Sequence, residues 1–373
     1  MEATGTDTRK NEMKYEKSEL ELMTTYQLRE ICRREKIMNG VIHPLDKEEL
    51  IQTIMRYMGK RQDFFICDKK KGGEERVEEF LKKTRIVIKP CKELYCQSQI
   101  LAYEGLSIEY YDGYTIPYKK ELAGTNAFLM GSDKTLCAIL NLKEHGGKQE
   151  KLYLTKAAEL ETRETQRKDY RIFCMGRQNS ECMYHLYYGE QTILPEHIEV
   201  YSIPLIDFVV RKPVTLMLPM AIDFGSVNTT AGVYLDSAYF EHVGQQAAIK
   251  NCRENEINYT AFEDGNGESM LLPSVIGVLA VEEEDYKLLF GYDAIRLANA
   301  SYVDEGFCVF YDVKRWIGEY DKEEEIVDRQ GRRRLVKRAE ILRRFFLYII
   351  RKTENRFKCR ISQVHISSPV KQK

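Results

Sequence analysis

Residues 220–235 read MAIDFGSVNTTAGVYL, two apolar runs joined by a short polar segment. The polar segment follows the pattern Asp-x-Gly-Ser-x-Asn-Thr and begins at Asp223. A glycine such as Gly225 permits a tight turn, and consecutive amides in a turn can converge on an anion such as a phosphate. An aspartate beside the turn can hold a hydrated divalent cation. The stretch predicts a β-hairpin, and its polar residues fit a phosphate site and an ordinary turn equally well.

The chain from Leu218 to Lys373 carries this stretch and four further blocks in a fixed order. The five blocks are AIDFGSVNTTAGVY (221–234), LLPSVI (271–276), FGYDA (290–294), YDVKRWIG (311–318) and VHISSPV (364–370). Together they resemble the start of the ATPase domain of the heat-shock protein 70 family, which belongs to the actin-like ATPase superfamily. The resemblance implies an actin-like, ribonuclease-H-like α/β lobe, of which this chain carries the N-terminal part.

The resemblance also implies which residues bind nucleotide. Phosphate oxygens would bind the backbone amides of Gly225, Ser226, Val227 and Asn228. Asp223 would act through magnesium-bound water, and Lys314 would reach the transferring phosphate, where a cation stabilises developing charge. The implied cofactors are ATP or ADP with Mg²⁺. The alternative for Lys314 is an ordinary surface lysine beside Arg315.

The chain departs from the family pattern at two places. Ser226 and Val227 stand where the family has two threonines, and Val227 can offer only its amide. The family's catalytic glutamate, second phosphate loop and adenosine-binding segment would all lie beyond Lys373, so these 373 residues carry about half of one nucleotide cleft. We therefore expect little or no ATP hydrolysis from the chain as given, and slow hydrolysis from a longer native form.

The composition restricts the classes of partner and location. Charge is nearly balanced, with 57 Lys and Arg against 58 Asp and Glu, so no global field attracts nucleic acid or an anionic membrane. No apolar run approaches the ~18 residues of a spanning helix, and the N-terminus lacks the basic start and apolar core of a signal peptide. Ten scattered cysteines without a Cys-x-x-Cys pair are typical of reduced thiols. These features predict a cytoplasmic protein without membrane partners.

The N-terminal residues predict a disordered segment followed by a helical module. Residues 1–19 are polar and lack apolar periodicity, which predicts disorder. Over 20–61, capping boxes at Thr24-x-x-Gln27 and Asp46-x-x-Glu49 each precede apolar residues at helical spacing. This pattern resembles the SAP-type module, many members of which bind DNA. Residues 14–61 carry only ten Lys and Arg against eight Asp and Glu, which favours protein docking or a spacer role over nucleic-acid binding.

The middle of the chain predicts a separate domain. Residues 62–84 read as a linker with a short helix. From 85 to 217, short runs rich in β-branched and aromatic residues, including 170–175 and 183–188, recur about every ten residues, which predicts an all-β sandwich or barrel. No residues in this domain indicate a particular chemistry. Cys174, Cys182 and His185 have no standard zinc spacing, so buried thiols are favoured over a metal site.

Two elements near the C-terminus are charged or amphipathic. Residues 319–338 place Glu323–325 and Arg332–334 on either side of an apolar pair, which predicts an exposed hairpin or loop with surface ion pairs. Residues 339–357 have an apolar face suited to packing on a sheet. The predicted fold is therefore multidomain α+β: a helical N-terminal module, an all-β middle domain and an incomplete actin-like α/β lobe.

Two functions fit these observations. The first is a chaperone-type ATP-binding protein of the heat-shock 70 kind, with protein clients or co-chaperones as partners. The second is a non-catalytic adaptor, in which the SAP-like module and the β domain recognise a partner and the ATPase-like part is only a scaffold. DNA is a weakly supported partner in the second case.

Overall fold

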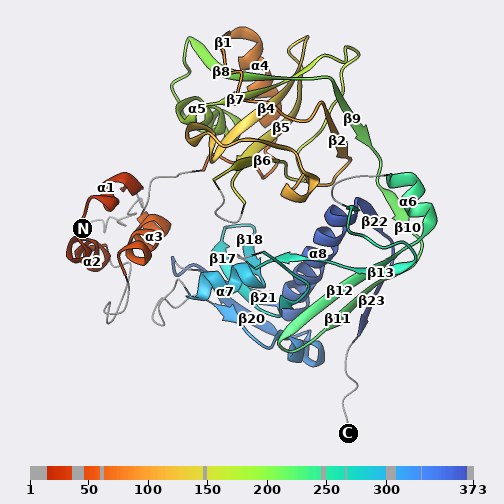
Figure 1. Cartoon of the computed structure of the whole chain (residues 1–373). Helices are drawn as coiled ribbons and strands as arrows, with labels where there is room; N and C mark the ends of the chain where they lie inside the picture. Colours follow the sequence, from red (N-terminus) through yellow and green to blue (C-terminus); the bar gives the residue numbers. More distant parts are fainter. Residues whose placement is uncertain are drawn as a thin grey trace, which may run out of the picture. The chain divides into compact units, whose positions relative to one another are not determined.

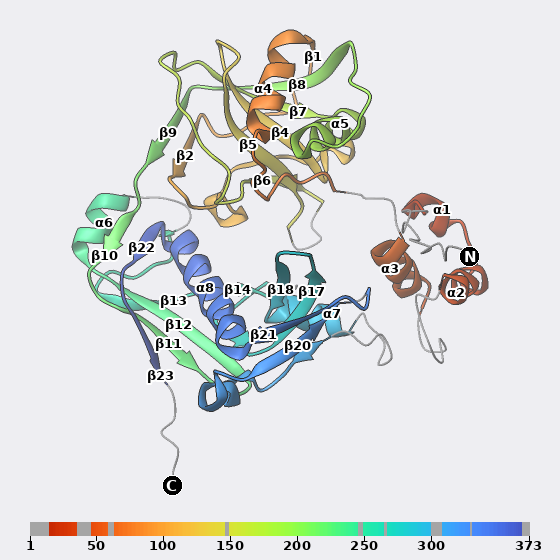
Figure 2. The same cartoon turned by 180° about the vertical axis from the view of Figure 1, so that it is seen from behind.

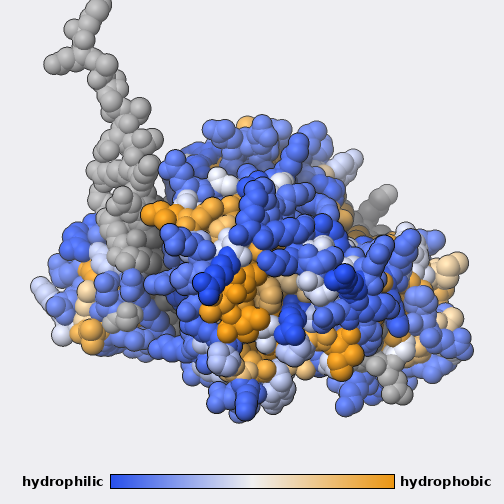
Figure 3. Space-filling model, turned by 90° about the horizontal axis from the view of Figure 1, so that it is seen from above, coloured by the Kyte–Doolittle hydropathy of each residue, from blue (hydrophilic) through white to orange (hydrophobic). Residues whose placement is uncertain are grey.

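The protein is a mixed α/β chain, and the computed structural model describes residues 15–35, 46–58, 63–145, 149–244, 249–264, 267–299, 308–328 and 330–367 (Figure 1). Internal contacts divide the chain into two compact units. The first comprises Met1–Gln62, Val275–Tyr311 and Asp321–Lys337, and the second Asp63–Ser274, Asp312–Tyr320 and Arg338–Lys373. No helix in the described ranges is long and apolar enough to cross a bilayer. The surface seen in Figure 3 is largely hydrophilic and is interrupted by hydrophobic patches.

The N-terminal part of the first unit contains three helices, α1 (Lys17–Glu21), α2 (Thr25–Arg34) and α3 (Lys47–Met58). Both predicted capping boxes are confirmed, because the Thr24 hydroxyl and the Asp46 carboxylate each accept the amide hydrogen three residues later. The helices share a core of Leu20, Leu28, Ile31, Cys32, Leu50, Ile51 and Ile54. The disorder predicted for residues 1–19 is wrong at its end, because α1 begins at Lys17. Residues 1–14 lie outside the described residues.

The rest of the first unit is a small α/β module. Its elements are β17 (Ile276–Val281), β18 (Tyr286–Phe290), α7 (Tyr292–Asn299), β19 (Val309–Phe310), β20 (Glu323–Val327) and β21 (Arg333–Lys337). Strand β17 pairs antiparallel with β18 and with β19, and β20 pairs with β21. The hairpin predicted over 319–338 is therefore confirmed.

The second unit is built around a seven-stranded sheet in the order β1-β8-β7-β4-β5-β6-β3 (Figure 1). Its strands are β1 (Arg85–Lys89), β3 (Thr115–Pro117), β4 (Thr125–Gly131), β5 (Leu136–Lys143), β6 (Lys151–Thr155), β7 (Tyr170–Met175) and β8 (His197–Leu205). Neighbouring strands are antiparallel except β1 and β8. A separate parallel pair joins β2 (Gln99–Tyr103) to β9 (Asp207–Arg211), and two 3₁₀ turns, η1 (Tyr110–Asp112) and η2 (Lys120–Leu122), lie between strands.

The seven-stranded sheet has an apolar core on each face. Alternate residues of β4 enter different clusters, Ala127 and Leu129 one and Phe128 and Met130 the other, as the two-residue period of a strand requires. Helices α4 (Gly73–Lys83) and α5 (Arg177–Tyr188) contribute to the cluster that contains Phe128.

The prediction of an all-β domain over 85–217 is wrong, because the domain contains a helix, α5. Residues 183–188, predicted as a strand, form the second half of α5. Short apolar runs do not distinguish a buried strand from a buried helix by periodicity alone. The better signal was Gly189, which ends α5 in the left-handed conformation with φ 74°, a common helix C-terminal cap.

The short helix predicted within 62–84 is confirmed as α4, but the linker predicted before it is wrong for its described part, because this segment belongs to the core of the second unit. Phe64, Ile66, Val77 and Leu81 are buried in the same cluster as Phe128. Two buried asparagines, Asn126 and Asn141, hold the extended part in place, the first by donating to the Phe64 carbonyl at 3.3 Å. Asn141 Oδ1 accepts the Ile66 amide at 3.0 Å and its Nδ2 donates to the Ile66 carbonyl at 3.1 Å.

Replacing Asn141 by alanine should destabilise the second unit by about 3 kcal/mol. The substitution leaves the buried N–H and C=O of Ile66 without partners, and each such group costs about 1–3 kcal/mol. Denaturant unfolding measures the loss, with Asn179→Ala as the control because the side chain of Asn179 makes an exposed hydrogen bond to Glu199. Equal effects of the two substitutions would contradict the proposed role of Asn141.

Lys156 is a buried lysine without a carboxylate partner among the described residues. Its side chain is 3% exposed, and its ammonium donates to the Ala157 carbonyl at 3.2 Å. Burial lowers the pKa of Lys156 from 10.5 to about 8, against the opposing effect of Glu74 and Glu159. Because the folded state binds fewer protons than the unfolded state between these values, stability should rise with pH from about 8 to 10.5.

Lys156→Met should therefore stabilise the protein at pH 7, and this gain should disappear by about pH 10.5. The expected gain is up to about 3 kcal/mol, from a difference of 1.36 kcal/mol per pKa unit. Chemical denaturation of the variant and the unaltered protein between pH 7 and 10.5 tests it. Lys151→Met, at an exposed position of β6, is the control, and a gain that does not depend on pH would refute the explanation.

The second unit also contains a smaller mixed sheet in the order β13-β12-β11-β23 (Figure 2). Its strands are β11 (Met220–Phe224), β12 (Asn228–Leu235), β13 (Glu256–Tyr259) and β23 (Val364–Ser367), with β16 (Leu272–Pro273) added at one end of β12. We call this the C-terminal sheet. The hairpin pair β11–β12 is antiparallel, whereas β23 runs parallel to β11. The hairpin and the strand predicted at 364–370 are thus confirmed over 220–235 and 364–367.

Helix α8 (Arg338–Phe357) packs on the C-terminal sheet and confirms the helix predicted over 339–357. Phe224 of β11 contacts Phe345 and Phe346, with ring centroids 5.8 and 5.1 Å away. The remaining elements are β10 (Val214–Leu216), α6 (Ser237–Val243), β14 (Phe262–Glu263), β15 (Glu268–Ser269), η4 (Val313–Glu319) and β22 (Cys359–Ile361). Strands β10 and β22 pair in parallel next to the C-terminal sheet.

Candidate functional site

The turn between β11 and β12, residues 225–227, is the candidate site. The Gly225 amide donates to the Asn228 carbonyl at 3.0 Å and closes the turn. A methyl group on Gly225 would collide with that carbonyl oxygen. The glycine is therefore required by the close approach of two backbone segments.

Ser274 fixes the orientation of the turn from one side. Its hydroxyl donates to the Gly225 carbonyl at 2.8 Å, and its amide donates to the Val227 carbonyl, also at 2.8 Å. Because the Ser274 proton is used in this way, the buried Thr229 hydroxyl donates to Ser274 Oγ at 2.9 Å. In a trans peptide the C=O and N–H groups point in opposite directions, so the Ser226 amide, which shares a peptide with the Gly225 carbonyl, points away from Ser274.

The amides of this turn are open to solvent. Those of Ser226 and Val227 have no acceptor within the described part of the chain. Both residues are exposed, and Val227 has 74% of its surface accessible. Successive amides of this kind form a concave surface with partial positive charge, which is a common way for proteins to bind phosphate.

Asp223 lies on the solvent-facing side of β11, opposite the side that packs on α8. Strand register places it between Thr230 of β12 and Ser367 of β23. Its Oδ1 accepts a hydrogen bond from the Ser367 hydroxyl at 2.5 Å. One carboxylate oxygen is therefore engaged by a hydroxyl, and the exposed group keeps acceptor capacity for a hydrated cation.

Lys314 lies on η4, which packs at the N-terminal end of α8. Arg338, the first residue of α8, forms an ion pair with Glu319 and lies over the Trp316 ring at 5.4 Å. Phe224 immediately precedes the turn and contacts Phe345 of α8, seven residues after Arg338. The turn and the Lys314 segment thus approach the same end of α8, although no hydrogen bond or ion pair between described residues joins Lys314 to Asp223.

Lys314 differs from the adjacent Arg315 in burial and in ion pairing. Lys314 is half-buried and has no ion-pair partner in the described ranges. Arg315 is exposed and pairs with Asp312 at 2.7 Å. The positive charge of Lys314 is therefore free to act on a ligand.

Sequence reasoning missed two residues of the site, Ser274 and Ser367. Both lie in blocks that the resemblance had singled out, 271–276 and 364–370. Their roles depend on which strands pair, because β16 brings Ser274 to the turn and β23 brings Ser367 to Asp223. Nothing in the local sequence of either block indicates these pairings.

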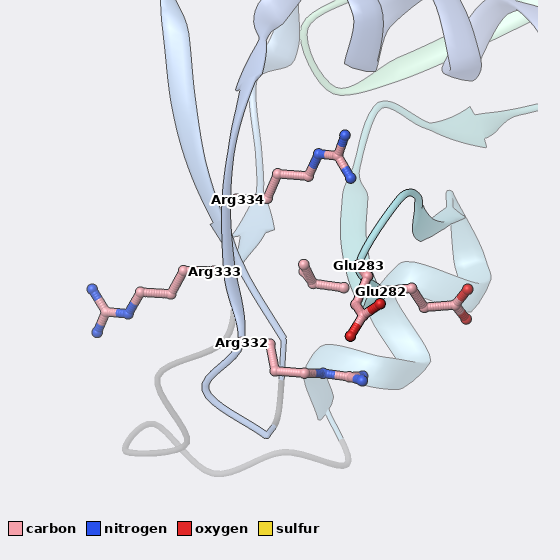
Figure 4. Close-up of a pocket in the computed structure, with 6 residues that line it drawn as sticks. Glu282, Glu283, Arg332, Arg333 and Arg334 are labelled. Atoms are coloured by element: carbon pink, nitrogen blue, oxygen red, sulfur yellow. The ribbon is translucent and has the colours of Figure 1, made fainter.

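Two surface hollows outside the turn are lined by charged residues. One, of about 440 Å³, lies in the first unit between the β17–β18 turn and the arginine triplet 332–334 (Figure 4). Arg332 pairs with Asp328 at 2.7 Å and Arg333 with Glu325 at 3.0 Å. Arg333 points to the opposite side of the hairpin from Arg332 and Arg334. The ion pairing predicted for this triplet is confirmed for Arg332 and Arg333.

The second hollow, of about 390 Å³, runs along α4. Its central carboxylate, Glu78, pairs with Lys82 at 2.7 Å and with Arg163 at 2.6 Å. The described residues contain no group of three His, Cys, Asp or Glu side chains that could hold a metal. Cys174 and Cys182 are buried in the clusters on opposite faces of the seven-stranded sheet, which confirms the buried thiols.

The chain matches no protein-family model, and no curated protein matches it either. The resemblances of 218–373 to the heat-shock protein 70 family and of 20–61 to SAP-type modules therefore rest on the quoted motifs and stay predictions.

Replacing Gly225 by alanine should distort the turn and destabilise the C-terminal sheet by about 1–3 kcal/mol, the usual cost of overpacking. Denaturant unfolding measures the loss, and hydrogen exchange should accelerate at the amides of β11 and β12. Gly267→Ala is the matched control, because a methyl group there meets no atom within 4 Å. Unchanged exchange in the hairpin of Gly225→Ala would show that the turn tolerates a side chain.

Proposed function

We propose that residues 218–373 form part of a nucleotide-binding lobe of the heat-shock 70 type. In this proposal the 225–227 turn binds a phosphate of ATP or ADP, and Asp223 binds the accompanying Mg²⁺ through water. The observation that carries the proposal is the pair of exposed amides at Ser226 and Val227, which the Ser274 contacts hold in a fixed orientation. An ordinary hairpin turn does not need a buried serine and threonine to fix its carbonyls.

The order of the elements also supports the proposal. The first block of the resemblance is the β11–β12 hairpin, the fourth is η4, and α8 and β23 follow. The result is a mixed sheet covered by a helix, as an α/β ATPase lobe requires. Gly225 and Asn228 lie at the ends of the turn, where their backbone groups shape it.

Each residue has a physical role in this proposal. Bound Mg²⁺ would neutralise phosphate charge, and Asp223 offers a carboxylate oxygen toward the ion's water. The turn amides orient the phosphate without a net side-chain charge. Lys314, whose charge is not neutralised by a described carboxylate, adds the positive charge that phosphoryl transfer needs near the phosphate.

The wider assignment follows from the same proposal. ATP binding coupled to conformational change implies protein clients or co-chaperones as partners. None of the ten cysteines, all of which lie in the described residues, forms a disulfide, which suits a reducing compartment such as the cytoplasm. We propose weak ATP hydrolysis at most for these 373 residues, because phosphoryl transfer requires charge stabilisation from several sides of the phosphate.

Asp223→Asn should remove the effect of Mg²⁺ on nucleotide affinity. The unaltered protein should bind ADP and ATP more tightly with Mg²⁺ than with EDTA, by about tenfold, which is about 1.4 kcal/mol. With Mg²⁺ and with EDTA alike, the variant should bind nucleotide with the affinity that the unaltered protein has in EDTA. Isothermal titration calorimetry measures this, with Glu256→Gln on an exposed position of β13 as the control. A Mg²⁺ effect that survives Asp223→Asn would contradict the assignment of Asp223.

Lys314→Ala should abolish any ATP hydrolysis and leave most of the nucleotide affinity, because the turn amides remain. Arg315→Ala, on the same 3₁₀ helix and already paired with Asp312, should leave hydrolysis unchanged. Release of labelled phosphate measures both. Vigorous hydrolysis by Lys314→Ala would show that this lysine does not contact the reacting phosphate.

Absence of ATP and ADP binding at millimolar concentration would refute the nucleotide proposal. The adaptor function would then be favoured, with the exposed Val227 side chain and the turn as part of a protein-binding surface.

A further inference from the structure

We propose that Asp112 of η1 is a positioning residue for the candidate site: by binding Lys358 it fixes the path of β22 and β23, and with it the contact of Ser367 with Asp223. The effect on nucleotide rests on the proposed function, whereas the effect on β22 and β23 does not. Asp112 belongs to the part of the second unit that surrounds the seven-stranded sheet, far along the chain from the hairpin.

The Lys358–Asp112 ion pair is almost fully buried. Lys358 Nζ lies 2.9 Å from Asp112 Oδ2 and also donates to the Ser107 carbonyl at 3.0 Å. The Lys358 side chain is 3% exposed and that of Asp112 6% exposed. Lys358 has φ 51°, in the left-handed region, which a lysine adopts only when its surroundings enforce it. The pair therefore holds the backbone where α8 ends.

Further contacts join residues 104–112 to residues 355–360. We call these two facing segments the seam. Asn355 accepts the Ser107 amide at 2.9 Å. Arg360 donates to the Glu104 carbonyl at 2.9 Å. Arg356 lies over the Tyr111 ring at 4.7 Å. Each contact joins the end of α8 or the start of β22 to the segment that carries Asp112.

A short series of hydrogen bonds leads from the residues after Lys358 to Asp223. Residues 359–361 form β22, which pairs with β10. The Ser362 hydroxyl then donates to the Leu216 carbonyl at 3.0 Å, and the Gln363 carbonyl accepts the Met220 amide at 2.9 Å. Strand β23 follows and ends at Ser367, which is bonded to Asp223. These hydrogen bonds join residues 359–367 first to β10 and then to β11, so a shift at Lys358 is transmitted along this chain segment.

The test compares Asp112→Asn with the unaltered full chain. Hydrogen exchange at the amides of 359–367 should be about tenfold faster in the variant. Well below the melting temperature, the gain in ADP affinity on adding Mg²⁺ should fall at least threefold, while the affinity in EDTA stays the same. If Asp112 affected only global stability, the substitution would change the ADP affinity equally with Mg²⁺ and with EDTA.

Two other variants complete the test. Glu199→Gln breaks the exposed Lys89–Glu199 pair of the seven-stranded sheet and should change neither measurement. Arg360→Gln removes the Glu104 contact at the more exposed end of the seam. It should fold even if Asp112→Asn does not, and it should accelerate exchange at 359–367 about two- to threefold.

The outcomes separate the two proposals. Unchanged exchange at 359–367 in both seam variants overturns the role of Asp112, as does accelerated exchange with an unchanged Mg²⁺ effect. If the unaltered protein binds no nucleotide but Asp112→Asn accelerates exchange at 359–367, the proposed function is refuted. The mechanical link between Asp112 and β23 is then still supported.

Discussion

The arrangement of the second unit depends on one buried ion pair. Lys358 and Asp112 are 246 residues apart and almost fully buried. Removing one partner of such a pair costs about 3–5 kcal/mol, because the other charge is then left in a low-dielectric interior without compensation. The pair determines where α8 ends even if it adds no net stability to the folded state. It penalises every arrangement of the chain in which α8 ends anywhere else.

A second constraint acts at the candidate site, where backbone contacts, and not an ion pair, fix the conformation of the turn. The Gly225 Cα lies so close to the Asn228 carbonyl that no side chain fits, and Ser274 holds the Gly225 and Val227 carbonyls on one side. The amides of Ser226 and Val227 are consequently presented to solvent as a preorganised group. Preorganised donors interact more strongly with an anion than flexible ones do, because their orientation is fixed before binding.

Local signals in the sequence were reliable where a few neighbouring residues determine the structure. The capping boxes at Thr24 and Asp46 and the hairpin at Gly225 each depend on contacts within four residues, and all three were predicted. Prediction failed where distant contacts decide. Residues 183–188 have a composition that suits a strand, but they pack as a helix against the seven-stranded sheet. Residues 63–72 look like a polar tether, but Asn141 and the apolar core hold them in place.

The same division applies to the candidate site. The sequence by itself determined the turn, because Gly225 and its polar neighbours leave the backbone few alternatives, and the resemblance to the heat-shock protein 70 family, which stays a prediction, singled out Asp223 and Lys314. Only the tertiary structure decided that Ser274 orients the turn, that Ser367 contacts Asp223 and that Asp112 holds the end of α8. These are pairings between residues 49, 144 and 246 positions apart, and such pairings are fixed by the packing of whole strands and helices, which no local stretch of sequence encodes.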